Sequence, residues 1–135
     1  MDVTAVIVEL TGRVDGLAGL RAYSWPVSPI SPPASYFGYP ENLEFDATGG
    51  RGMDRLSLPL VVVAGRAEER TSRDKLAAWC TGSGPTSIKA AIEFGEPVAF
   101  DSVRVEGVEF EPVTISGVDY AGAIFTLDIA GQGAP

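Results

Sequence analysis

The sequence predicts a single α+β domain over residues 1–135, in which a mostly antiparallel β-sheet is packed by an N-terminal helix and two central helices. Apolar residues recur at helical spacing near the N-terminus and again in the middle of the chain. They alternate with other residues along the segments around residues 60 and 125, which is typical of strands. This order of elements favours helices layered on an antiparallel sheet. No stretch approaches the ~20 apolar residues of a membrane span, so no membrane association is expected.

The first part of the chain is expected to contain one helix and several short strands. Asp2 is a suitable N-cap for an amphipathic helix, because apolar residues follow it at helical spacing. A short strand at 21–25 then leads into a proline-rich connector at 26–33, where four prolines favour a stiff, extended backbone. Further strands are expected at 34–39 and 43–47. The apolar positions of the helix are Val3, Val6, Ile7, Leu10 and Val14.

A glycine-rich hairpin loop is predicted at 48–54, between the strand at 43–47 and a longer strand that follows. The loop lacks the spacing of a phosphate-binding loop and precedes a strand, which favours a hairpin tip over a nucleotide site. Pro59 cannot donate a ladder hydrogen bond, so its strand is expected at an edge of the sheet, at least locally. The core face of this strand is expected to consist of Leu56, Leu58, Leu60, Val62 and Ala64.

Two helices are expected between residues 72 and 92. Ser72 is the expected cap of the first, which runs through Cys80 and ends at Gly82. Cys80 is expected to be a buried small hydrophobe in a reducing cytoplasm, with a reactive thiol as the less favoured alternative. The segment 84–87 starts a shorter helix, whose apolar side consists of Ile88, Ala91 and Ile92.

The C-terminal third is predicted to form bulged and alternating strands. The apolar positions change parity at Gly107, which indicates a β-bulge that returns the glutamates on either side to one polar face. Ser116 and Gly117 then turn the chain. The last strand, over 120–129, has one apolar face and one mixed face.

The net charge of −8 is concentrated in this last third. After residue 89, the single basic residue Arg104 accompanies eight acidic ones. Such a field repels phosphate backbones and argues against a nucleic-acid-binding module, although not against a surface past which DNA slides. A solvated face, a hard-cation site and an acid–base pair are the alternatives, and the absence of calcium-loop spacing favours the solvated face. The carboxylates concerned are Glu106, Glu109, Glu111, Asp119 and Asp128.

The sequence offers few routes to catalysis. It contains no histidine and one cysteine, which argues against triad chemistry and a soft-metal site. We therefore expect no enzymatic activity and no cofactor, and we expect function by assembly. Tyr36, Phe37 and Tyr39 form an aromatic run in which successive side chains point to opposite faces, so at least one ring is expected to leave the core. A contact surface and ordinary core packing both remain open for that ring.

Several short motifs resemble those of tail terminator proteins of siphovirus-type bacteriophages, which have long, non-contractile tails, especially phages of actinobacteria. These motifs, which span nearly the whole chain, are Gly38-Tyr39-Pro40, Phe45-Asp46-Ala47, Arg51-Gly52-Met53-Asp54-Arg55, the segment 82–89 and the ending Phe125-Thr126-Leu127-Asp128-Ile129. The resemblance implies a structural virion protein that forms a homohexameric ring, caps the tail tube, stops its polymerisation and provides the joint to the head connector. It implies a place at the head-proximal end of the tail, and in the host cytoplasm during assembly.

The same resemblance implies a tail tube protein and a connector or stopper protein as partners, with DNA passing through the ring without specific binding. Candidate contacts to a ring neighbour or to the tube are Tyr36, Tyr39, Arg51, Met53 and Arg55. The five carboxylates named above are the candidate lining of the channel. The alternatives are another neck protein, such as a head-completion or stopper protein, a small hydrolase or nucleotide-binding enzyme, and a monomeric ligand-binding module.

Overall fold

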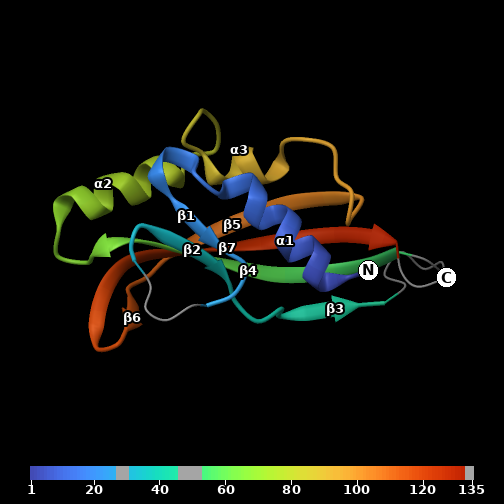
Figure 1. The fold of residues 1–135 in the computed structure, drawn as a ribbon, viewed down its shortest axis with the longest axis horizontal. Coiled ribbons are helices and arrows are strands. Elements are labelled where there is room, and N and C mark those ends of the chain that lie inside the picture. Colours follow the sequence, from blue (N-terminus) through green and yellow to red (C-terminus); the bar gives the residue numbers. More distant parts are fainter. Residues whose placement is uncertain (27–30, 46–52, 133–135) are drawn as a thin grey trace.

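The protein is an α+β sandwich in which the helices lie on one side of a mixed, mostly antiparallel sheet (Figure 1), as the sequence predicts. The computed structural model describes residues 1–26, 31–45 and 53–132, and within them it contains seven strands and three α-helices. The helices are α1 (Val3–Val14), α2 (Arg70–Trp79) and α3 (Ile88–Glu93). The strands are β1 (Arg21–Tyr23), β2 (Ala34–Phe37), β3 (Asn42–Glu44), β4 (Met53–Arg66), β5 (Ser102–Phe110), β6 (Val113–Ile115) and β7 (Val118–Gln132).

The two long strands, β4 and β7, form the centre of the sheet. They pair antiparallel along almost their whole length, and the order across the sheet is β1-β2-β4-β7-β5, with β3 on β4 and β6 on β7. The predicted core face of β4 is buried, and it is joined in the core by alternate residues of β7. Because strand side chains alternate between faces, the remaining side chains of each strand lie on the opposite side of the sheet.

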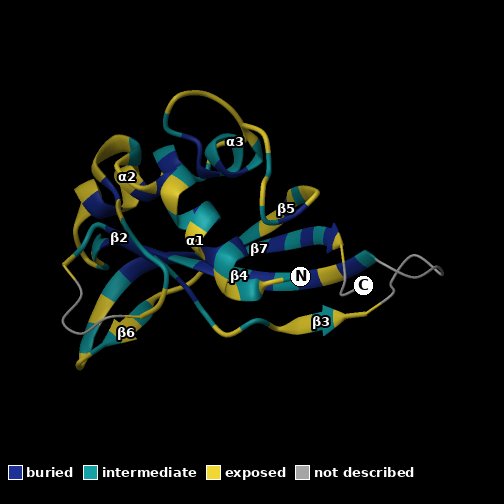
Figure 2. Ribbon diagram, turned by 45° about the vertical axis from the view of Figure 1, so that its right-hand side comes forward, coloured by how far each residue is buried: buried dark blue, intermediate teal, exposed yellow. Residues whose placement is uncertain are grey.

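Helix α1 begins where the sequence predicts it. The side chain of Asp2 accepts a hydrogen bond of 3.2 Å from the backbone N–H of Ala5, which supplies one of the partners that a helix N-terminus lacks. Its apolar stripe packs into the same core as the sheet, and so do the buried residues of the other two helices. Figure 2 shows this buried layer between the helices and the sheet. No helix among the described residues is long and apolar enough to span a membrane.

The predicted hairpin is present, since β3 pairs antiparallel with β4. Residues 46–52 of its loop lie outside the described residues, as do residues 27–30 of the proline-rich connector. Met53 and Asp54, which the prediction assigned to the loop, belong to β4 instead. The strands predicted at 21–25, 34–39 and 43–47 are each shorter than expected, ending at Tyr23, Phe37 and Glu44.

The prediction that Pro59 places its strand at an edge is wrong for the strand as a whole. β4 has neighbours on both sides, with β7 on one and β2 and β3 in succession on the other. Pro59 falls in the gap between the segments of β4 that pair with β2 and β3, where its carbonyl accepts from the N–H of Gly38 at 3.0 Å. Its missing N–H would also point toward this gap, so the ladder to β7 loses no hydrogen bond.

Ser72 does not cap α2, in contrast to the prediction. The helix starts two residues earlier, with Glu69 at the N-cap position and no side-chain capping bond. Ser72 is buried inside the helix, where its side chain packs against Gly65 of β4 so closely that a Cβ at residue 65 would clash with it. The helix ends at Trp79, and Cys80 is half-buried against the core, where burial raises the pKa of its thiol to about 11.

The shorter helix and the bulge are confirmed. Ser87 caps α3 by accepting from the N–H of Ala90, and the register of β5 on β7 shifts between Val105 and Gly107. β5 is an edge strand, and the carboxylate of Glu93 accepts from the N–H of Val105 at 2.9 Å. Burial opposes ionisation of Glu93, but its bonds with Lys89 and Val105 outweigh burial and lower the pKa of this carboxyl.

We expect Gly65→Ala to lower the free energy of unfolding by about 1–3 kcal/mol, because the added methyl group overpacks the contact between β4 and α2. Adding Ser72→Ala removes the hydroxyl that clashes and should restore most of this loss, with Ser72→Ala alone as the control. Urea unfolding of the three variants measures the coupling. Additive losses would show that these two residues do not pack together.

Candidate interaction surfaces

The side of the sheet that faces away from the helices is the first candidate surface, and we call it the open face. The strand register aligns one row across it, from Tyr23 and Tyr36 through Val61 and Ile124 to Glu109. The first four of these side chains are half-buried, and none of them belongs to the core under the helices. Partial burial raises the pKa of the Tyr36 phenol. The row presents apolar and aromatic area that no helix among the described residues covers.

The aromatic run behaves as its alternation predicts. Phe37 is buried in the core, Tyr36 lies on the open face, and Tyr39 is 92% exposed just beyond the end of β2. Tyr39 lines a pocket together with Trp25, which is itself exposed. Two aromatic rings of the run therefore leave the core, and Tyr39 is available for contact with another molecule.

One basic candidate and one acidic candidate form a pair. On the open face, Arg55 of β4 forms a bidentate salt bridge with the carboxylate of Asp128 of β7. This hydrogen bond, together with the charges of Asp128, Glu44 and Glu106, raises the pKa of the Arg55 guanidinium. The partner of Arg55 thus belongs to the same chain, and its positive charge offsets part of the negative charge of Asp128, Glu44 and Glu106. Met53 is half-buried at the start of β4, and Arg51 lies outside the described residues.

The five acidic candidates do not share one face. The register places Glu109 and Asp128 on the open face, and Glu106, in the bulge, interacts electrostatically with Arg55 there. Glu111 follows β5, with its N–H donating to the carbonyl of Gly122 at 3.1 Å. Asp119 has the opposite parity on β7 and accepts a hydrogen bond of 2.6 Å from the hydroxyl of Thr114. The carboxylates are therefore not gathered as a cation site requires, and no cluster of three or more metal-ligating side chains occurs among the described residues.

A second surface, which the sequence reasoning missed, is the loop that joins α3 to β5. Its side chains Phe94 and Val98 are 81% and 90% exposed, which is unusual for large apolar residues that are not scattered singly. The signal in the sequence was two apolar residues set among Gly95, Glu96 and Pro97, where a loop normally carries polar residues. We call residues 94–98 the apolar loop.

The apolar loop is held in place from helix α1. The carboxylate of Glu9 accepts from the backbone N–H groups of Val98 and Ala99, at 3.2 and 2.8 Å. It also forms a salt bridge with Arg13, at 3.3 Å, and Arg13 in turn donates to the carbonyl of Ile92. The same guanidinium lies 5.2 Å from the centroid of the Phe100 ring, within range of a cation–π interaction. Both ends of the loop are therefore fixed to one helix.

No family model matches the chain, and no curated protein matches it.

We expect Glu9→Ala to lower the free energy of unfolding by about 1–3 kcal/mol, because it leaves the loop N–H groups without their acceptor and removes the salt bridge of Arg13. Amide hydrogen exchange should accelerate at Val98 and Ala99 more than in the central strands. The matched control is Glu41→Ala, which removes an exposed carboxylate and should change stability by no more than about 0.5 kcal/mol. Unchanged protection of both amides in Glu9→Ala would contradict the proposed anchoring.

Proposed function

We propose that this protein is a tail terminator: a structural subunit that assembles into a ring, caps the tail tube of a long-tailed phage and joins it to the head connector. The observation that carries the proposal is the open face of the sheet, whose row of Tyr23, Tyr36, Val61 and Ile124 is half-buried without a covering helix. A row of partly exposed aromatic and aliphatic side chains is typical of a surface that meets another protein. The motif resemblance supports the same assignment.

Tyr36 and Tyr39 are the anchors in this proposal. Both extend from one short stretch of chain, one on the open face and one fully in solvent, and tyrosine is a residue in which binding energy concentrates at interfaces. Met53 lies at the start of β4, on the side of the hairpin loop. The salt bridge to Asp128 places Arg55 at the border of this surface with a partner inside its own chain.

The carboxylates of the open face border the DNA channel in this proposal. Glu106 and Glu109 are exposed on the edge strand β5, and their negative charge repels the phosphates of passing DNA. Asp119, which belongs to the other face, does not line the same wall.

The capping test adds purified protein to polymerising tail tube protein and measures tube length by electron microscopy. The wild-type protein should shorten the tubes and form rings at their ends. Tyr36→Ala combined with Tyr39→Ala should weaken capping by about 30-fold, the equivalent of one 2 kcal/mol anchor. The control is Val8→Ala, which trims an exposed apolar residue of α1 and should leave capping unchanged. Tubes of unchanged length with wild-type protein would overturn the proposal, and binding only to the portal of the head would assign another neck function.

The channel test measures the rate of DNA ejection from virions whose protein carries both Glu106→Lys and Glu109→Lys. We expect rings to form and ejection to slow. The effect should be clearest at low salt, because salt screens the electrostatic attraction between these lysines and DNA beyond about 8 Å at physiological ionic strength. Virions with Glu68→Lys and Glu69→Lys, at the exposed start of α2, are the control. Equal ejection rates in the two sets would show that the open-face carboxylates only solvate the protein.

A further inference from the structure

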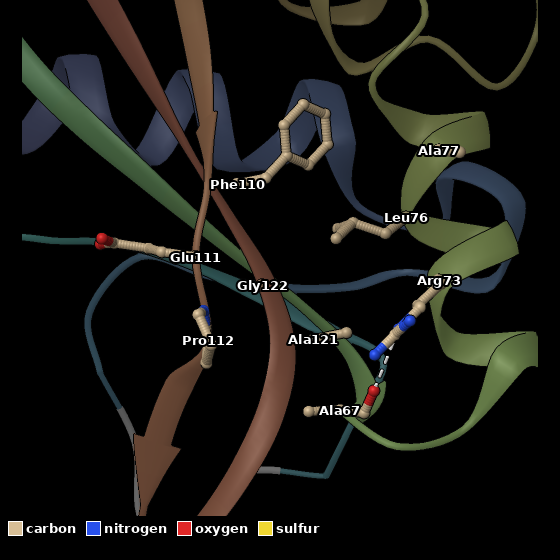
Figure 3. Close-up of a pocket in the computed structure, with 9 residues that line it drawn as sticks. All are labelled: Ala67, Arg73, Leu76, Ala77, Phe110, Glu111, Pro112, Ala121 and Gly122. Carbon is tan, nitrogen blue, oxygen red and sulfur yellow. Dashed lines mark hydrogen bonds between the residues drawn. The ribbon is translucent and has the colours of Figure 1, made fainter.

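A pocket of about 320 Å³ lies between α2 and the end of β5 (Figure 3). Leu76 and Ala77 line it from α2, Phe110 and Pro112 line it from the other side, and Ala121 of β7 contributes to its wall. Phe110 has the parity of a core residue, yet it is 63% exposed. Figure 3 shows its ring pointing from β5 toward α2. The pocket is therefore an opening in the apolar layer, large enough for one more aromatic side chain.

One wall of the pocket carries a cation. Arg73 of α2 lines it, and its Nε donates to the carbonyl of Ala67 at 3.2 Å, which holds the guanidinium against the wall. Figure 3 shows the carboxylate of Glu111, on the far side, pointing away from Arg73. Across the described ranges of the chain, no carboxylate lies within salt-bridge distance of Arg73. The pocket thus combines an apolar interior with a positive charge at its wall.

The apolar loop has the complementary composition. Phe94 and Val98 project into solvent, and the exposed carboxylate of Glu96 lies between them in sequence, also with no described cation within salt-bridge distance. Glu9 and Arg13 hold the loop in place before any contact is made. A surface that is ordered in advance loses little conformational entropy when it binds.

The loop of one chain is too far away to fill the pocket of the same chain. Phe94 follows Glu93, whose carboxylate accepts from the N–H of Val105 in the middle of β5. The strand continues for five more extended residues to Phe110 at the pocket, a span of roughly 17 Å. In Figure 1, α2 lies at the left end of the molecule and the segment that follows α3 lies to the right of that helix. Any contact between loop and pocket must therefore join two molecules.

We propose that the apolar loop of one subunit docks into the α2–β5 pocket of a second copy of this chain, with Phe94 as the anchor and Glu96 paired with Arg73. The inference rests on the proposed function, because a ring requires each subunit to carry two different, complementary surfaces that repeat from copy to copy. Loop and pocket meet this requirement in apolar character and in charge. The contact is heterologous, so it closes into a ring when the rotation between neighbours allows it.

The test reverses the two charges separately. Glu96→Arg and Arg73→Glu should each weaken self-association by roughly 30-fold, because each creates a like-charge pair in the contact. Mixing the two variants should restore assembly, since each loop then meets a pocket of opposite charge. Sedimentation velocity and electron microscopy of tube ends measure the effect. Failure of the mixture to recover, with both variants folded by circular dichroism, overturns the contact.

Two uncharged variants test the apolar part of the contact. Phe94→Ala removes the anchor, and Ala77→Trp fills the pocket from an exposed position of α2, so each should reduce assembly. Val8→Ala, on α1, is again the control. Full assembly of both variants overturns the docking site.

The outcomes separate this inference from the proposed function. If wild-type protein caps tubes and all four variants cap them equally well, the contact is wrong and the function stands. If the charge reversals control oligomers in solution but no version affects tube length, the contact stands and the tail terminator assignment is wrong. A wild-type protein that stays monomeric both in solution and with tube protein overturns both.

Discussion

The antiparallel ladder between β4 and β7 is the constraint on which the rest of the structure depends. These two strands run side by side through the centre of the sheet, and every other strand except β1 pairs directly with one of them. Because side chains alternate with a period of two, this single register decides which residues of both strands enter the core. A slip of one residue would exchange Leu58 with Pro59 and Leu127 with Thr126, and the helices would then lie on a half-polar face.

The two faces of the sheet differ in how they are covered. The helices α1, α2 and α3 pack on one face, and their apolar residues form one core with it. No helix among the described residues covers the open face, although Ala34 and Val63 at one end of it are buried. Its aromatic and aliphatic row ends in the acidic edge formed by β5. The same helices place the apolar loop and the α2–β5 pocket at separate points of the surface. In the proposed assembly, the sheet face meets one partner, and the loop and the pocket join neighbouring copies.

The errors of the sequence interpretation have a common origin in packing between elements of the fold. Pro59 has no N–H and therefore sits where β4 needs no ladder hydrogen bond from it. That position is the gap between the partner strands β2 and β3 rather than an edge of the sheet. Ser72 has the chemistry of a cap, yet it lies inside α2, where Gly65 of the preceding strand β4 leaves space that its small side chain fills. In both cases a local rule allowed two solutions, and a contact with another element of the fold decided between them.

The sequence by itself determined the α+β class, the first helix with its Asp2 cap, the core face of β4, the short helix that starts after the segment 84–87, and the bulge at Gly107. Each of these depends on periodicity or on residue types within a short stretch of chain. It also indicated that an aromatic ring would leave the core at Tyr36 to Tyr39. Only the tertiary structure decided that Arg55 pairs with Asp128, that Asp119 lies on the other face, and that Glu9 holds Val98. Those outcomes depend on register and on contacts between segments far apart in the chain, which local patterns do not encode.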